Sequence, residues 1–191
     1  MGNLQCWGKC AKRIRKLLRL GETEPKELYT DTTYVFYDDT YNSGTILWTR
    51  FSKYTWYAGH HGTVDGKLKL DPEDDAATQN IGSSWSMPTK DQFEELTKYV
   101  LWMQDGTSGW IGTSKINGYK IYIPSAGWEY STVPNTHMQA WYWSCELDEP
   151  SLDNSDYYSY MLTNAPQSGL AVHDTQRVQG LSVRGVTKVS K

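Results

Sequence analysis

One cysteine and two histidines are the residues whose chemistry could support nucleophilic catalysis. Cys145 follows Tyr-Trp-Ser in an aromatic segment, and His137 and His173 lie elsewhere in the chain. A thiol becomes a good nucleophile when a neighbouring base activates it. A cysteine within a strand is more often a small buried hydrophobic residue. We therefore predict no catalytic residue, and an enzyme with Cys145 as nucleophile is the alternative.

An acidic stretch supplies the oxygen atoms that a hard cation prefers. It contains Asp148, Glu149, Asp153, Asn154 and Asp156. Carboxylate and amide oxygens of this kind bind Ca²⁺, but the spacing matches no calcium-loop motif and acidic loops are usually solvated. We therefore predict no metal site and no cofactor, with Ca²⁺ at this loop as the alternative.

Aromatic residues are the remaining candidate functional groups. The chain has nine Trp and fourteen Tyr against three Phe, and Trp and Tyr suit half-buried positions and recognition surfaces. In a strand at Trp141–Cys145, Trp141 and Trp143 share one face and Tyr142 takes the other. Recognition residues are often carried by loops on a rigid sheet. We predict ligand contacts at Trp128, Tyr130, Asp153, Asn154, Asp156, His173 and Arg177.

Length and charge limit the function classes. A chain of 191 residues forms one domain with a sizeable core. Residues 1–20 carry six basic and no acidic residues, which leaves thirteen basic and twenty-two acidic residues in 21–191, a net charge near −9. A body this acidic lacks the basic footprint of nucleic-acid binding. No apolar run is long enough to span a membrane, and nothing in the sequence indicates an oligomeric state.

Residues 1–20 differ from the rest of the chain. One helical face would carry apolar residues and the other Lys and Arg, which is typical of a helix that binds a membrane surface or a partner helix. The segment lacks the continuous apolar stretch of a secretory signal peptide. The apolar positions are Leu4, Trp7, Ala11, Ile14, Leu17 and Leu18.

Two helices are predicted before the late strands. Asp71 and Pro72 indicate a helix start that Gly82 ends. Thr89 and Gln92 have the spacing of a capping box for the next helix, and we expect Trp85 to be a buried anchor in front of it. Gly106, Gly109 and Gly112 mark a loop or tight hairpin. Strands are predicted at 119–123, 141–145, 157–162, 170–172 and 181–186, which gives an α+β fold.

Six motifs in order cover residues 21 to about 187. They are Gly21-Glu22-Thr23 with Pro25-Lys26, Leu70–Ala77, Trp85–Thr89 with Phe93–Leu96, Ile121–Gly127, Tyr142-Trp143-Ser144, and Ser182-Val183-Arg184. Together they resemble the Fibrobacter succinogenes major paralogous domain family, which is common in surface proteins of Bacteroides-type gut bacteria. The resemblance implies a C-type-lectin-like fold with a mainly antiparallel twisted sheet and long loops. It also implies an exported, often lipoprotein-like chain at the outer-membrane surface or outside the cell.

The resemblance fails at the start of the chain. Family members have an opening segment where this chain has residues 1–20. Reading the back-translated segment one nucleotide later can restore that opening, so we interpret residues 1–20 as an out-of-frame reading, with the frame restored at Gly21. We predict that they pack poorly and that 21–191 is the domain. The overall interpretation is a non-catalytic ligand-binding or adhesion module for a glycan or protein, with a structural or assembly domain as a further alternative.

Overall fold

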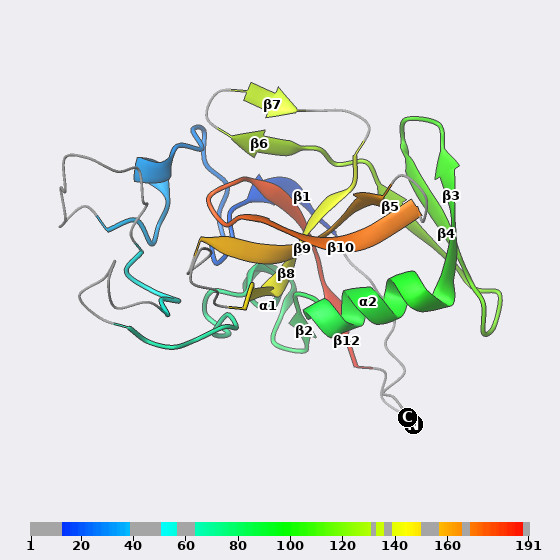
Figure 1. Cartoon of the computed structure of the whole chain (residues 1–191), viewed down its shortest axis with the longest axis horizontal. Helices are drawn as coiled ribbons and strands as arrows, with labels where there is room; N and C mark the ends of the chain where they lie inside the picture. Colours follow the sequence, from blue (N-terminus) through cyan, green and yellow to red (C-terminus); the bar gives the residue numbers. More distant parts are fainter. Residues whose placement is uncertain are drawn as a thin grey trace.

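A computed structural model describes residues 13–38, 51–56, 64–130, 133–135, 139–149, 157–165 and 169–188 (Figure 1). The helices are η1 (Asp31–Thr33, a 3-10 helix), α1 (Ala76–Ile81) and α2 (Lys90–Tyr99). The strands are β1 (Arg13–Leu18), β2 (Trp85–Ser86), β3 (Val100–Asp105), β4 (Gly109–Ser114), β5 (Lys120–Pro124), β6 (Trp128–Tyr130), β7 (Val133–Asn135), β8 (Trp141–Leu147), β9 (Tyr158–Ala165), β10 (Gly169–Gln176), β11 (Leu181–Arg184) and β12 (Val186–Thr187). This confirms the predicted α+β class.

The largest sheet is the middle layer of the molecule. Its five strands have the order β1-β11-β8-β9-β10, and β8 is parallel to β11 and antiparallel to β9. Neighbouring side chains of a strand point to opposite faces. Both faces of β8 are buried, because Trp143 packs in one hydrophobic cluster and Tyr142 in another. Trp141 packs on the same side as Trp143, as predicted.

Helix α2 covers one face of this sheet and begins as predicted. The Thr89 hydroxyl accepts a hydrogen bond from the Gln92 N–H, and the Gln92 side chain accepts one from the Thr89 N–H. Phe93 and Leu96 are buried against the cluster that contains Tyr142. None of the helices in the described ranges is long and apolar enough to cross a membrane.

The residues in front of α2 pack differently from expectation. Trp85 is half-buried in β2, which pairs with β12 in a two-stranded ribbon, and its ring lies over Gly185. Met87 is the buried residue of this stretch, with 1% of its surface exposed. The expectation of a buried Trp85 is therefore wrong, because an indole over a glycine in an edge ribbon keeps one side at the surface.

Helix α1 starts later than predicted. Its N-cap is Asp75, whose side chain accepts hydrogen bonds from the N–H groups of Ala77 and Thr78. The same carboxylate accepts from the Met87 N–H at 2.8 Å. Asp75 is therefore the residue that caps the helix. Asp71 lies in the turn before the helix, where its backbone carbonyl accepts hydrogen bonds from the N–H groups of Asp74 and Asp75.

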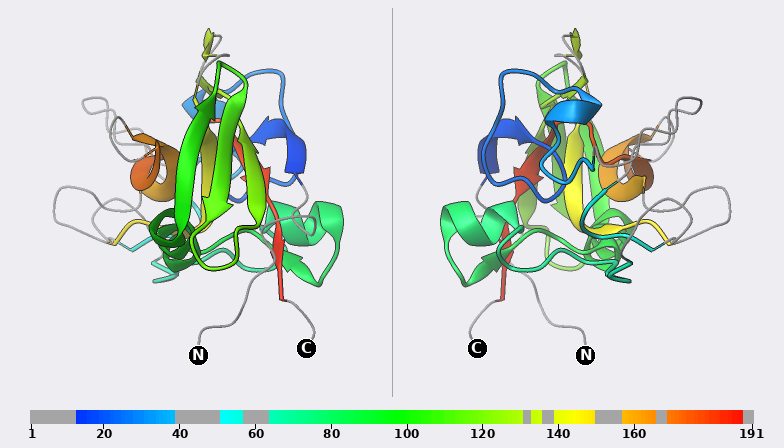
Figure 2. Two further views of the ribbon diagram at one scale, coloured as in Figure 1. Left: turned by 90° about the vertical axis from the view of Figure 1, so that its right-hand side faces the viewer. Right: turned by 90° about the vertical axis from the view of Figure 1, so that its left-hand side faces the viewer.

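The late strands follow the predicted pattern. All five predicted strand regions appear, as β5, β8, β9, β10 and the pair β11 and β12. The glycine-rich region is a hairpin between β3 and β4 that closes at Asp105 and Gly109. With β5 these strands form a separate three-stranded sheet beside the main one (Figure 2, left). At Gly112 a Cβ atom would lie 2.6 Å from the side chains of Trp102 and Val100, so only glycine fits there.

Residues 13–20 belong to the fold, which differs from the expectation that residues 1–20 lie outside it. Residues 13–18 form a strand that pairs antiparallel with β11, where an amphipathic helix was expected. Leu18 and Leu20 are fully buried, and the Leu18 carbonyl accepts a hydrogen bond from the Trp143 indole at 2.8 Å. A strand belongs here because β11 would otherwise present an unpaired edge. The residues before β1 lie outside the described ranges.

Arg19 follows β1, and its guanidinium group is buried with few hydrogen-bond partners. Its side chain is 1% exposed. Nη2 donates to Thr33 Oγ1 at 2.8 Å and to the Leu28 carbonyl at 3.4 Å, but Nε and Nη1 are buried without a hydrogen-bond partner. The guanidinium lies 5.1 Å from the centre of the Tyr29 ring. Burial lowers the pKa of Arg19, since the site solvates the cation less well than water does.

We expect Arg19→Met to stabilise the protein by about 1–2 kcal/mol, because it removes two unpaired buried N–H groups and keeps most of the side-chain volume. The gain would appear as a higher urea midpoint at unchanged m-value. Arg19→Lys is the control, since it keeps a buried cation and should bring no gain. A clear loss of stability in the Met variant would show that the contacts to Thr33 and Tyr29 outweigh the unpaired groups.

Candidate functional site

The candidate surface is built on the β6–β7 hairpin. Glu129 fixes this hairpin to the main sheet through two backbone hydrogen bonds with Gly180, at 2.9 and 2.8 Å. On the same short strand, Trp128 and Tyr130 are half-buried against the core. The Trp128 ring lies 5.6 Å from that of Trp141 on β8, at an angle of 37°. This tilted aromatic pair is held by two separate sheets and is therefore rigid.

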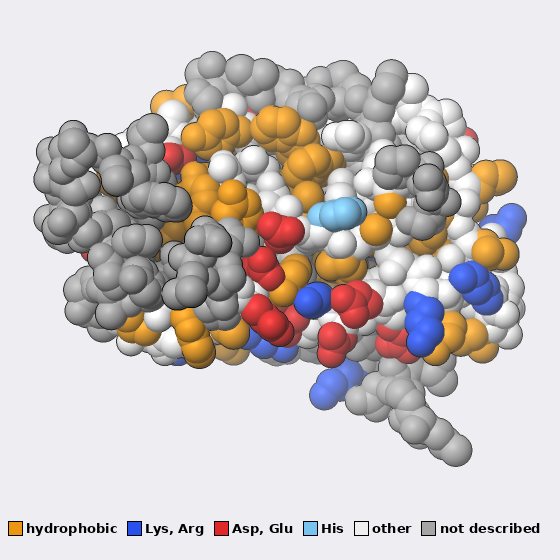
Figure 3. All heavy atoms as spheres, in the orientation of Figure 1, with side chains coloured by type: hydrophobic (Ala, Val, Ile, Leu, Met, Phe, Trp, Pro, Cys, Tyr) orange, Lys and Arg blue, Asp and Glu red, His pale blue; other side chains and the backbone are white. Residues whose placement is uncertain are grey.

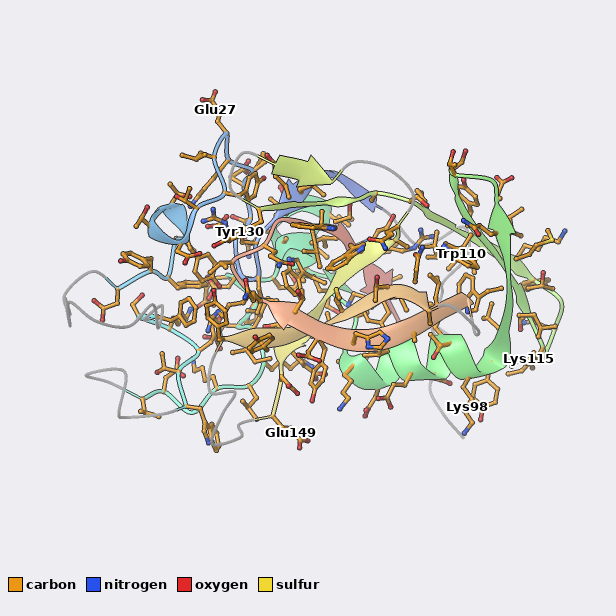
Figure 4. The ribbon with its side chains drawn as sticks, turned by 45° about the horizontal axis from the view of Figure 1, so that its top comes forward. Glu27, Lys98, Trp110, Lys115, Tyr130 and Glu149 are labelled. Atoms are coloured by element: carbon orange, nitrogen blue, oxygen red, sulfur yellow. The ribbon has the colours of Figure 1, made fainter. Side chains whose placement is uncertain are left out.

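Hydrogen bonds orient the polar edges of these aromatic side chains. The Trp141 indole donates to Gln139 Oε1 at 2.9 Å. The Tyr130 hydroxyl donates to Asp31 Oδ1 at 3.3 Å, which links β6 to η1 (Figure 4). Burial, and then the nearby Asp31 carboxylate, raise the pKa of Tyr130. The hydroxyl therefore stays protonated at neutral pH and keeps its role as donor.

His173 lies at the surface on β10, as a ligand contact requires. The strand pairing places it across from Met161 on β9, which in turn faces Trp143 on β8. His173 is therefore on the sheet face that the β6–β7 hairpin covers further along. Figure 3 shows the described histidine between apolar side chains over β6 and a group of acidic side chains. An exposed imidazole in this position can donate or accept a hydrogen bond.

Arg177 is not available to a ligand, which corrects the prediction. Its side chain is fully buried. Nε donates to the Tyr34 hydroxyl at 3.0 Å, and the Nη atoms donate to the carbonyls of Tyr54 and Lys53 at 2.9 and 3.0 Å. The guanidinium carbon lies 4.2 Å from the centre of the Phe51 ring. Arg177 thus fastens two early loop segments to the turn between β10 and β11.

The loop residues predicted to contact ligand are Asp153, Asn154 and Asp156, and they lie outside the described residues. At the start of this loop, Asp148 Oδ1 accepts a hydrogen bond from the Glu149 N–H at 2.8 Å. Ca²⁺ binding by the loop stays an alternative. In this face of the molecule, the structure brings together Trp128, Tyr130 and His173 of the seven predicted contacts.

A different acidic group lies elsewhere, at Asp71, Glu73 and Asp74, with one oxygen of each within 4.8 Å of the others. Lys53 already forms ion pairs with all three carboxylates. Its Nζ lies 3.4 Å from Asp71 and 3.3 Å from Glu73, and it also contacts Asp74. Lys67 adds a second ion pair to Asp71 at 2.6 Å. A metal ion would have to displace an ammonium group, so these carboxylates act as partners of lysine.

Cys145 has the environment of a structural thiol. It is 2% exposed, inside the core cluster of Trp143. Burial raises its pKa from 9.0 to about 12, so the thiolate is scarce at neutral pH. A nucleophilic cysteine needs the opposite shift and access to substrate. Of its possible histidine partners, His137 lies outside the described residues.

The structure also exposes an apolar surface that the sequence analysis missed. On the side of β3-β4-β5 away from the main sheet, Leu101 and Met103 are 62% and 63% exposed, and in the turn after β4, Ile116 and Tyr119 reach 73% and 78%. We call this surface the outer sheet face, which comprises Leu101, Met103, Ile111 and Tyr122, and the exposed residues Ile116 and Tyr119 lie in the turn at its end. The apolar run at 100–103 could have indicated this surface, because consecutive apolar residues in a strand make both faces of the strand apolar.

Comparisons of the chain with models of known protein families, with curated proteins and with solved structures find no match. The resemblance to the Fibrobacter succinogenes major paralogous domain family therefore stays a prediction, as does the C-type-lectin-like form of the α+β fold.

We expect stability to fall as the pH rises above about 9. Burial raises the pKa of Cys145 from 9.0 to about 12 and that of Tyr34 from 10.0 to about 12. Between the ordinary and the raised values these groups ionise only in the unfolded chain, so unfolding releases protons and each group weakens folding by up to about 1.4 kcal/mol per pH unit. Urea unfolding across this range measures the loss.

The variants Cys145→Ala and Tyr34→Phe identify the groups responsible. Each removes one titrating group, so its stability should decline less steeply above pH 9 than that of the parent protein. Stability curves for both variants that run parallel to the parent curve would show that other groups cause the decline.

Proposed function

We propose that this protein is a non-catalytic binding module whose ligand is a glycan or a protein. The observation that carries the proposal is the Trp128–Trp141 pair, two partly buried indoles whose ring centres are 5.6 Å apart and which two different sheets hold in place. The apolar face of a sugar ring, or an apolar side chain of a protein, packs on such a ring with little loss of conformational freedom. His173 and Tyr130 supply polar groups at the margin of the same face.

The rigidity of the site supports a role in binding. β6 is tied to the main sheet through Gly180, and the polar edge of Trp141 is tied to Gln139. A preorganised surface binds more tightly because less entropy is lost on association. The thiol that would make the protein an enzyme is buried and has a raised pKa. These observations favour a binding module over an enzyme that uses Cys145.

We further propose that the protein is exported and lies at the outer-membrane surface or outside the cell. The support is the ordered set of motifs that resembles the Fibrobacter succinogenes family. The unpaired nitrogens of Arg19 are the observation that favours the out-of-frame interpretation, since the shifted reading can place Ala, a small residue, at this position, whereas the pairing of β1 with β11 was not expected from that interpretation. Ala needs no hydrogen-bond partners, whereas Arg19 leaves two nitrogens unpaired.

Trp128→Ala and Trp141→Ala should each weaken ligand binding at least tenfold, because each removes half of the stacking surface. A glycan array identifies a ligand, and titration with that ligand measures affinity. Trp56→Ala is the matched control, because Trp56 is an exposed tryptophan outside this surface. Ligand binding that survives both substitutions would reject the Trp128–Trp141 site, and a blank array with a self-associating protein would favour the structural or assembly alternative.

Sequencing the gene together with its upstream DNA tests the proposed export. We expect the shifted frame to continue upstream of Met1 into an apolar signal segment, because the family resemblance implies an exported protein. A good translation start at Met1 with no coding frame above it would overturn the frame interpretation and the export proposal together. The binding proposal would then stand on the Trp128–Trp141 surface alone.

A further inference from the structure

The outer sheet face has a regular arrangement of apolar side chains. Met103 on β3, Ile111 on β4 and Tyr122 on β5 are cross-strand neighbours in one row. Leu101 lies in the next row beside Thr113 and Lys120. Alternation places all of them on the same side of the sheet. Figure 2 (left) shows the three strands in front of the rest of the molecule, so this face forms one end of the protein.

The fold does not require this face to be apolar. The opposite side of the same sheet supplies the core contacts, through Val100, Ile121 and Ile123. Six of the ten exposed large hydrophobic side chains among the described residues nevertheless lie between Tyr99 and Tyr122. Apolar residues gathered in this way on a surface mark a site of interaction, because isolated exposed ones are ordinary and a cluster is not.

The segment that carries the outer sheet face has more basic than acidic residues. The stretch 98–124 contains Lys98, Lys115 and Lys120 and a single acid, Asp105, in a chain whose net charge is −3. Lys98 and Lys115 lie together at the end of α2 (Figure 4), where Lys115 Nζ donates to the Lys98 carbonyl at 2.7 Å. All three lysines are exposed. A partner that complements this surface is therefore apolar and anionic.

Charge and size decide which partner fits. Two copies joined through this face would bring six lysines together with two aspartates, an arrangement that like-charge repulsion opposes. The three strands span only roughly 15 Å by 20 Å, or roughly 300 Å², whereas a stable protein interface buries about 800 Å² on each partner. A lipid surface needs no such area, since its binding grows with each inserted apolar side chain and each lysine at the headgroups.

We propose that the outer sheet face docks onto a membrane surface that contains anionic lipids. Leu101, Met103 and Tyr122 enter the headgroup region together with Ile116 of the adjoining turn, and a tyrosine there places its ring in the apolar part and its hydroxyl among the headgroups. Lys115 and Lys120 bind lipid phosphates, with their stems along the apolar surface. The backbone of β4 is paired on both sides, and β3 and β5 are edge strands whose outer N–H and C=O groups stay within reach of water and headgroups at the interface.

The test is cosedimentation of the full chain with phosphatidylcholine vesicles, with and without phosphatidylglycerol. We expect binding only to the vesicles with phosphatidylglycerol, and weaker binding at high salt. Lys115→Ala with Lys120→Ala should lower partitioning about twenty-five-fold, since each lysine near an anionic surface contributes roughly fivefold. Leu101→Asn with Met103→Asn should lower it at least tenfold.

Matched variants separate this face from the rest of the protein. Lys188→Ala removes an exposed lysine elsewhere, and Val35→Asn removes an exposed apolar side chain elsewhere, so both should bind vesicles as the parent does. Trp128→Ala should also bind vesicles normally, which keeps this test independent of the proposed ligand site. Circular dichroism and the urea midpoint establish that each variant is folded.

Three outcomes would overturn the proposal. The first is absence of binding to the anionic vesicles. The second is vesicle binding that the substitutions in the outer sheet face leave unchanged, which would place the lipid contact elsewhere in the chain. The third is self-association in sedimentation velocity that these same substitutions abolish while vesicles stay unbound, which would identify a second copy as the partner.

Discussion

The burial of strand β8 on both faces is the constraint on which the rest of the structure depends. From Tyr142 to Cys145 each side chain is buried, although successive residues point to opposite sides of the sheet. A strand of this kind requires a covering layer on each side. Helix α2 and the β3-β4-β5 sheet supply one layer. The other is supplied by the short helix α1 and by loop segments rich in aromatic residues. These loop segments lack the regular backbone pairing that holds a helix or sheet together.

Arg177 holds the aromatic loop segments on this side of β8 in place. Its three donor groups bind the Tyr34 hydroxyl and two backbone carbonyls, so one side chain fixes segments that are far apart in sequence. Arg19 lies in the same layer, and two of its nitrogens are unpaired. A buried guanidinium costs less free energy when its N–H groups have hydrogen-bond partners, so burial of Arg177 is expected to cost less than burial of Arg19. Each Arg177 donor that the hydrogen bonds above name has a partner in the fold, whereas Arg19 keeps two buried nitrogens without one.

Local signals predicted a large part of this fold. The capping box at Thr89 and Gln92 and the late strands depend on nearby residues, and the structure has them as expected. The strand at β1 could not be predicted in this way. Its basic and apolar pattern is typical of a helix, and only the unpaired edge of β11, more than 160 residues later, makes it a strand. Nonlocal pairing outweighs local propensity there.

The candidate site shows the same division between local and nonlocal information. Trp128, Tyr130 and His173 were identified because aromatic and polar residues in a late segment of loops and strands favour recognition, and these three lie on one face. Arg177 has the same kind of sequence context, but the aromatic side chains that enclose it come from early segments whose position no local pattern reveals. Burial of a polar residue is a property of the assembled core, so sequence alone could not exclude it.

The two proposed surfaces use the rigidity of the main sheet in different ways. Tyr130 belongs to the proposed ligand site and Lys115 lies beside the outer sheet face, and the two residues lie toward opposite ends of the molecule (Figure 4). The aromatic pair is half-buried and packs on the core, so part of its apolar character serves the fold. The outer sheet face has no such use, because its sheet already packs through the other side. Its apolar residues contact one another across the strands and add no contact to the core, so the proposed contact outside the chain is a physical reason for their apolar character.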